Sequence, residues 1–121
     1  RGIEREAPVI AVMGDGTFGF HMAEIDTAVR CGLPVVLVVG NDAAWNAEHQ
    51  IQVRDYGAAR AHACELNPAR YDLVATALGG HGELVTDAAA VPAALERAIA
   101  SGKPAVVNVM IERLPAPVVR R

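Results

Sequence analysis

Three short, strongly apolar segments alternate along the chain with segments whose apolar residues recur every three or four positions. The strongly apolar segments are residues 8–13, 33–39 and 105–111, and runs of this length are typical of strands buried on both faces of a parallel sheet. Residues 20–31 have helical spacing and are followed by Gly32, a common helix stop. The first half of the chain therefore predicts a strand, a helix and a parallel strand, joined by a right-handed crossover.

The second half continues the alternation less regularly. Residues 47–54 predict a short helix, 55–67 an irregular segment with some helix, 72–78 a helix, 81–85 a short strand or turn, and 88–100 a helix. The predicted fold class is α/β, with an open, mostly parallel sheet and helices on both faces. We expect one domain over residues 1–114, incomplete at its N-terminus, and an exit segment or tail over residues 115–121.

Composition narrows the classes of protein that fit this pattern. The chain has 121 residues, of which 52% are hydrophobic, and its formal net charge is -3. This apolar fraction predicts additional apolar surface that a partner chain or domain covers. The lack of a basic block argues against binding to nucleic acid, and no apolar run reaches the roughly 20 residues of a membrane span. We therefore expect a cytoplasmic protein, with Cys31 and Cys64 as buried, reduced thiols.

Two polar clusters follow the first two predicted strands directly. The first is Gly14-Asp15-Gly16-Thr17, and the second is Gly40-Asn41-Asp42. Ligands of open parallel sheets bind beyond the carboxyl ends of the strands. Because a single helix connects the two strands, their ends can be neighbours, and Asp15 and Asp42 can meet in one cleft.

The residue types in these clusters indicate a metal-bound phosphate ligand. Glycines on both sides of Asp15 allow close approach of a ligand, and Thr17 offers a hydroxyl group and an N–H near a helix start. Two carboxylates beside an anion would repel it unless a hard divalent cation lay between them, as Mg²⁺ or Ca²⁺ can. No lysine follows the glycines as in a P-loop, and the third glycine of GxGxxG is missing.

The same residues carry a family resemblance. Gly14-Asp15-Gly16, followed by a helix, a strand and Asn41-Asp42, resembles the GDG to NN motif of thiamine diphosphate-dependent enzymes, in particular the acetolactate synthase, benzoylformate decarboxylase and pyruvate oxidase group. The resemblance extends through AEIDTAVRCGLPVVLVVGND and through YDLVATALGGHGELVTDAAAVPAALERAIASGKPAVVNVMIE. It implies the thiamine diphosphate-binding fold, in the C-terminal, diphosphate-binding domain of such an enzyme.

This resemblance assigns roles to individual residues. It implies that Mg²⁺ is bound by the side chains of Asp15 and Asp42 and by the main-chain oxygen of Ala44, while Gly16 and Thr17 hold the diphosphate. The full implied cofactor-binding set is Gly14, Asp15, Gly16, Thr17, Asp42, Ala44, Trp45 and Asn46. The chain departs from the family pattern twice, with Asp42 in place of the usual asparagine and Ala44 in place of the frequent glycine. Aspartate remains a hard oxygen ligand, although it adds a negative charge beside the diphosphate.

The resemblance also places the start of the helix over residues 47–54 along the cofactor and substrate pocket. Trp45, Glu48 and His49 are therefore candidates for substrate contact. For Glu48 and His49 a solvated helix face is an equally good interpretation, whereas Trp45 is better explained as a pocket wall than as an isolated core residue.

The implied activity needs residues that this chain does not contain. In the family, a glutamate of another domain, usually in another subunit, activates the cofactor, so we expect no catalytic residue here. We predict the diphosphate- and Mg²⁺-binding part of an enzyme that decarboxylates or carboligates small 2-keto acids, inactive alone. Its expected partner is the pyrimidine-binding domain of the same or a second subunit, in a homodimer or homotetramer. Two alternatives remain: a Mg²⁺-dependent phosphoryl-transfer enzyme with Asp15 as nucleophile, and a non-catalytic assembly module.

Overall fold

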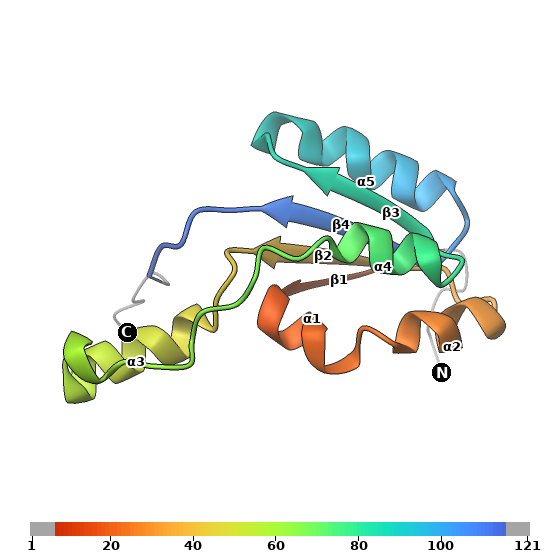
Figure 1. Ribbon diagram of the computed structural model, residues 1–121. Helices are drawn as coiled ribbons and strands as arrows, with labels where there is room; N and C mark the ends of the chain where they lie inside the picture. The colour runs from red at the N-terminus through yellow and green to blue at the C-terminus, as the bar shows by residue number, and fades with distance from the viewer. Residues whose placement is uncertain (1–6, 116–121) are drawn as a thin grey trace.

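The fold is one parallel sheet of four strands with helices on both faces (Figure 1). A computed structural model describes residues 7–115; the charged residues 1–6 and nearly all of the expected tail over 115–121 lie outside them. The strands are β1 (Val9–Gly14), β2 (Val35–Asn41), β3 (His81–Val85) and β4 (Ala105–Met110). The helices are α1 (Asp15–His21), α2 (Glu24–Arg30), α3 (Asn46–Tyr56), α4 (Tyr71–Ala77) and α5 (Val91–Ala100), with short 3-10 turns at Ala58–Arg60 and Ala88–Ala90.

The strand order is β1-β2-β4-β3, and each neighbouring pair is parallel. One core packs α1, α2 and α4 against the sheet through side chains that include Phe18, Ile25 and Tyr71. The other packs α5 against the opposite face through Ala94 and Ala98. Figure 1 shows α5 on one side of the sheet and the other three helices on the opposite side. The predicted α/β class and the parallel sheet are therefore confirmed.

The first crossover differs from the single helix predicted over residues 20–31. Helix α1 begins at Asp15, directly after β1, and α2 begins only at Glu24. Met22 and Ala23 separate the two helices. Phe18 of α1 and Ile25 of α2 nevertheless pack in the same core. Apolar spacing alone did not locate this break, because the spacing is similar on both sides of it.

Strand β2 is displaced by two residues from its predicted range. It begins at Val35, since Pro34 lacks the N–H that a ladder hydrogen bond needs. It continues to Asn41, a polar residue that is fully buried. The side chain of Asn41 is hydrogen-bonded within the protein, which is how a polar residue can end a buried strand at low cost.

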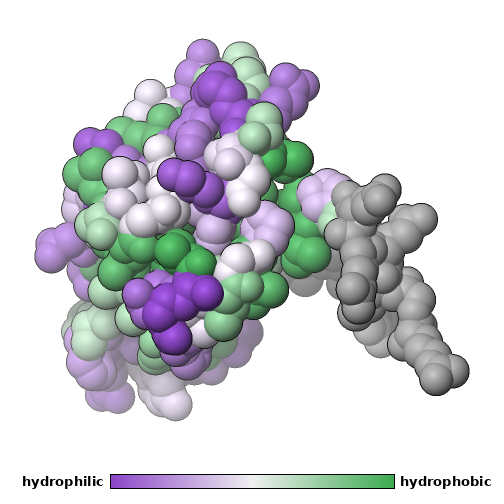
Figure 2. Space-filling view, turned by 90° about the vertical axis from the view of Figure 1, so that its right-hand side faces the viewer, coloured by the Kyte–Doolittle hydropathy of each residue, from purple (hydrophilic) through white to green (hydrophobic). Residues whose placement is uncertain are grey.

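Part of the apolar surface predicted from composition is visible on β1, whose outer edge is unpaired within residues 7–115. Val12 is 77% exposed and Val9 57% exposed. Apolar patches also lie between polar side chains on the side shown in Figure 2, near the amino ends of the strands. Within the described part of the chain, no helix has the length and apolar character needed to cross a bilayer.

The two cysteines have different surroundings. Cys64 is buried, as predicted, and both thiols are free. The prediction that Cys31 is buried is wrong, because Cys31 is exposed. It caps the C-terminus of α2, where the chain turns toward β2 and the side chain faces solvent.

Candidate functional site

The two polar clusters meet at the carboxyl edge of the sheet. Parallel pairing of β1 with β2 places Gly14 opposite Gly40, so Asp15 and Asn41 follow neighbouring positions. Helix α1 starts at Asp15 with no intervening loop, and α3 lies beyond the ends of the strands (Figure 1). The meeting of the two clusters, which was predicted from the strand-helix-strand pattern, is confirmed.

Asp15 is the most enclosed acidic group of this site. It is only 1% exposed. Its Oδ1 accepts a hydrogen bond from the N–H of Gly16 at 2.9 Å, and its Oδ2 accepts one from the N–H of Ala44 at 3.2 Å. The carboxylate therefore joins the start of α1 to the loop that follows β2.

Burial raises the pKa of the Asp15 carboxyl group above its ordinary value, and the negative charge of Asp42 raises it further, against the two hydrogen bonds. The contribution from Asp42 shows that the two acidic side chains lie close enough to interact electrostatically. A bound divalent cation would favour the charged form of Asp15.

The loop over residues 42–44 has an unusual backbone. Ala43 has a φ of 54°, a left-handed conformation that costs about 1 kcal/mol or more for a residue with a Cβ. The N–H of Ala43 donates to the side-chain Oδ1 of Asn41 at 3.2 Å, and its carbonyl oxygen accepts from the N–H of Leu66 at 2.8 Å. These contacts offset the strain and fix the path of the loop.

Arg113 is hydrogen-bonded to the main chain of the same loop. Its guanidinium group donates to the carbonyl oxygen of Asp42 at 3.2 Å and to that of Ala43 at 2.8 Å. A further N–H group donates to the carboxylate of Glu65 at 2.6 Å. Sequence analysis missed Arg113, although it follows β4 at the carboxyl edge where both polar clusters were sought.

A pocket of about 300 Å³ opens between these elements. Of the residues predicted from sequence, the pocket is lined by Gly14, Asp15, Gly16, Thr17, Asp42, Ala44, Trp45, Asn46 and Glu48. It is also lined by Gly40, Ala47 and Ile111, which the prediction did not include. His49 is not one of the lining residues; its Nδ1 is buried and has no hydrogen-bond partner among the described residues.

Gly16 and Trp45 form the tightest contact of the pocket wall. A Cβ at residue 16 would lie 2.8 Å from the indole ring of Trp45, closer than carbon atoms approach one another. The ring of Phe20 also lies near the indole, with 5.1 Å between the ring centroids, and Phe20 is 70% exposed. Glycine at residue 16 is therefore needed for Trp45 to reach its place in the wall.

The donors at this pocket fit a hard divalent cation beside an anion. Asp15, Asp42 and Ala44 line the pocket, and carboxylate and main-chain oxygens are the hard donors that such a cation prefers. Within residues 7–115 no three His, Cys, Asp or Glu side chains gather as a metal cluster. An ion here would consequently keep ligand positions for phosphate oxygens or water, which is the usual behaviour of Mg²⁺.

Comparison with known proteins agrees with this geometry. The family described as "Thiamine pyrophosphate enzyme, C-terminal TPP binding domain" matches residues 2–109. The acetolactate synthase large subunit IlvG of Mycobacterium tuberculosis is 50% identical over 105 residues, which are 86% of this chain and 19% of that protein. The 2-hydroxyacyl-CoA lyase 2 of Caenorhabditis elegans is 40% identical over 110 residues, 86% of this chain and 17% of that protein.

A solved structure gives the same result for the fold. The crystal structure of benzoylformate decarboxylase from Polynucleobacter necessarius superposes with a TM-score of 0.84 and 22% sequence identity, over 94% of this chain and 21% of that one. The chain thus spans about a fifth of the length of the proteins it matches. From the family match and this fold, we conclude that the chain belongs to the thiamine pyrophosphate (thiamine diphosphate) enzymes, as their C-terminal cofactor-binding domain.

Proposed function

We propose that this chain holds the diphosphate and Mg²⁺ of thiamine diphosphate in an enzyme that acts on small 2-keto acids, by acetolactate synthase-like carboligation or by decarboxylation. The observation that carries the proposal is the buried Asp15 carboxylate, which joins the start of α1 to the loop after β2 at the edge of the pocket. The 50% identity to an acetolactate synthase large subunit supports the choice of reaction.

Different residues of the pocket are proposed to bind the metal ion and the diphosphate. Asp15, Asp42 and the main-chain oxygen of Ala44 are the proposed Mg²⁺ ligands, and Gly16 and Thr17 face the diphosphate at the start of α1. The positive end of α1 favours negative charge at that point. When bound, the cofactor supplies the stabilised carbanion with which a bond next to a carbonyl is broken or formed.

The rest of the enzyme lies in other domains. The relatives are multi-domain proteins, and this chain matches about a fifth of their length. We propose that the activating glutamate comes from a pyrimidine-binding domain of the same or a second subunit, in a homodimer or homotetramer. These 121 residues alone then turn over no substrate.

Phosphoryl transfer by Asp15 has less support from the site. A nucleophilic aspartate in such an enzyme would need a cationic residue, usually a lysine, close to the phosphate. Lys103, the one lysine of the chain, lies between α5 and β4, so it is at the amino edge of the sheet, opposite the pocket. An assembly role alone leaves the burial of Asp15 unexplained.

The test is binding and turnover by the full-length protein that contains this chain. Calorimetric titration with thiamine diphosphate should show binding that requires Mg²⁺, and the loaded protein should consume pyruvate with release of CO₂. The isolated chain should release none under the same conditions. Metal-independent binding, or turnover by the isolated chain, would contradict the proposal.

Exchange of Arg113 for methionine should weaken Mg²⁺-dependent binding of thiamine diphosphate by about tenfold, because residues that orient a ligand loop typically have effects of this size. Methionine keeps much of the side-chain volume but donates no hydrogen bond to the carbonyl groups of Asp42 and Ala43. Calorimetry on the full-length protein measures the change. The matched control is Arg30→Met, which removes an arginine whose ion pair with Asp26 lies on the surface of α2; equal affinities in the two variants would show that Arg113 does not hold the loop.

A further inference from the structure

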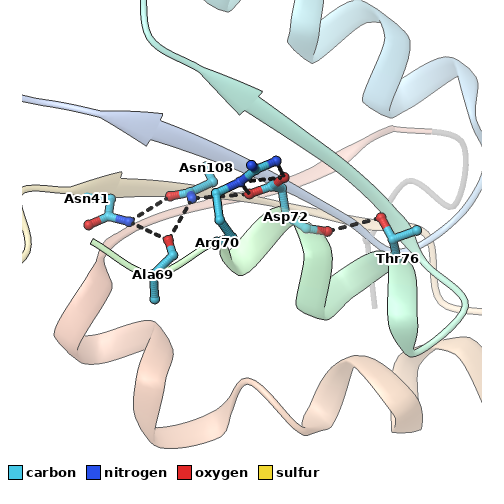
Figure 3. Close-up of polar contacts among 6 residues, drawn as sticks. All are labelled: Asn41, Ala69, Arg70, Asp72, Thr76 and Asn108. Carbon is cyan, nitrogen blue, oxygen red and sulfur yellow. Dashed lines mark hydrogen bonds and ion pairs between the residues drawn. The ribbon is translucent and has the colours of Figure 1, made fainter. Parts of the chain in front are cut away.

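We propose that the buried Asp72 carboxylate, which is paired with Arg70, positions the cofactor loop through a relay of two buried asparagine side chains, Asn108 and Asn41. The inference rests on the proposed function, because the loop that it positions carries the proposed metal ligands Asp42 and Ala44. Figure 3 shows the relay running from α4 across the sheet toward the carboxyl end of β2.

The contacts of the relay form a continuous path. Asp72 accepts hydrogen bonds from the Arg70 guanidinium group, the shortest at 2.6 Å, and its Oδ1 lies 3.4 Å from the Nδ2 of Asn108. The Oδ1 of Asn108 accepts from the Nδ2 of Asn41 at 3.1 Å. Asn41 and Asn108 are fully buried, and Asp72 is 3% exposed.

Acceptors at the α4 end determine which way both amides point. A carboxylate offers no donor, so Asn108 must direct its Nδ2 toward Asp72 and its Oδ1 toward Asn41. Asn41 then directs its Nδ2 toward Asn108 and keeps its Oδ1 for the N–H of Ala43. The carbonyl oxygen of Ala69 accepts from both amides, at 2.9 and 3.0 Å, and favours the same orientation.

This orientation acts on the strained part of the loop. The Oδ1 of Asn41 accepts the N–H of Ala43, whose φ is 54°. An Asn41 side chain turned the other way would place an amide N–H against that donor, leaving both unsatisfied in a buried place. The relay therefore keeps Ala43 in the conformation that directs Ala44 to Asp15.

Close packing of α4 on β3 brings Asp72 within reach of the sheet. A Cβ at Gly82 would overlap the main-chain carbonyl of Asp72, so only glycine at this position of β3 lets α4 approach so closely. The Arg70 side chain is about half exposed, whereas the carboxylate of Asp72 is buried. Arg70 can therefore be substituted without changing the packing of the core.

Two substitutions distinguish loss of the Asp72 carboxylate as a hydrogen-bond acceptor from loss of its ion pair with Arg70. Asp72→Asn keeps the shape of the side chain but leaves one oxygen, for which Arg70 and Asn108 compete. We expect the dissociation constant for Mg²⁺, titrated into the full-length protein at fixed thiamine diphosphate, to rise about fivefold, the equivalent of one typical hydrogen bond. Arg70→Gln breaks the ion pair but leaves the carboxylate as acceptor, and it should change that constant by less than about twofold.

Glu83→Gln is the matched control for stability. Glu83 is paired with Arg97 in a comparable, largely buried carboxylate contact between β3 and α5, remote from the loop. The Glu83→Gln substitution should lower the melting temperature without altering Mg²⁺ affinity. Equal Mg²⁺ affinities for Asp72→Asn and Arg70→Gln, or a loss of affinity in Glu83→Gln that matches Asp72→Asn, would overturn the relay.

Amide hydrogen exchange tests the relay independently of the cofactor. In the metal-free, full-length protein the N–H of Ala43 should exchange faster in Asp72→Asn than in Arg70→Gln or the parent. If the parent binds neither Mg²⁺ nor thiamine diphosphate, the proposed function fails, while faster exchange at Ala43 would still support the relay. Unchanged exchange at Ala43 in Asp72→Asn would refute it.

Discussion

Asparagine in place of Asp15 should abolish Mg²⁺-dependent binding of thiamine diphosphate to the full-length protein, with a loss of affinity of more than roughly 100-fold, larger than the effect usual for residues that only orient ligands. The variant loses the negative charge at the centre of the proposed metal site. Its single oxygen cannot accept from both Gly16 and Ala44 as the two carboxylate oxygens do. Calorimetry at saturating Mg²⁺ measures the loss.

Asp26→Asn is the matched control, because Asp26 lies exposed on α2 and makes only a surface ion pair with Arg30. Its cofactor affinity should equal that of the parent. If Asp15→Asn retained the parent's affinity, the assignment of Asp15 to the metal would be wrong. A loss in both variants would point instead to a general defect of the fold.

The same substitution has a pH-dependent effect on the metal-free protein. Burial, together with the charge of Asp42, raises the pKa of Asp15 in the folded state, so the folded protein binds more protons than the unfolded chain between the ordinary and the raised value. The stability of the parent therefore falls as pH rises through that interval. Asparagine does not titrate, so the melting temperature of Asp15→Asn relative to the parent should increase over the same interval in thermal melts without metal.

Alanine in place of Asp42 should weaken metal binding strongly, whereas Asp42→Asn should retain it. Asparagine keeps a hard side-chain oxygen for the cation, and alanine offers none. The cost of the alanine variant should be at least about tenfold in the dissociation constant for Mg²⁺, measured by calorimetry on the full-length protein. Equal affinities for the parent and both variants would contradict a metal shared between the two polar clusters.

Asp42→Asn should in addition extend metal binding to lower pH. The negative charge of Asp42 is one cause of the raised pKa of Asp15. Its removal lowers that pKa, so a higher proton concentration is needed before protons compete with the cation at Asp15. The pH midpoint of Mg²⁺ binding should move downward relative to the parent, and a midpoint that moved upward would exclude this electrostatic coupling.

Much of the fold followed from local pattern. The apolar runs predicted β1, β2 and β4. The spacing over residues 88–100 predicted one helix, of which the structure forms a 3-10 turn at Ala88–Ala90 and α5 at Val91–Ala100. The helix predicted over residues 47–54 corresponds to α3, which ends at Tyr56 and is followed by Gly57 with a φ of 84°. The break between α1 and α2 was not predicted, because it depends on how both halves meet the core and not on the residues at the break.

The candidate site was predictable where its residues follow strands in sequence. Asp15 and Asp42 were found from the two polar clusters. Arg113 and Asn108 were missed, because their partners in the site are 67 to 71 residues away along the chain. No local pattern distinguishes Asn108, a polar residue within an apolar strand, from an error in the predicted strand.

Sequence by itself determined the strand-helix alternation, the meeting of two aspartate-bearing strand ends and, through the motif, the family. These depend on periodicity and on short separations, which the order of residues encodes directly. Tertiary structure decided which groups hold the loop over residues 42–44 in place. The Asn41–Asn108–Asp72 relay acts there because parallel pairing of β2 with β4 and close packing of α4 on β3 bring distant polar groups together away from water, where each must find a partner. Arg113 reaches the loop from the surface, just after β4.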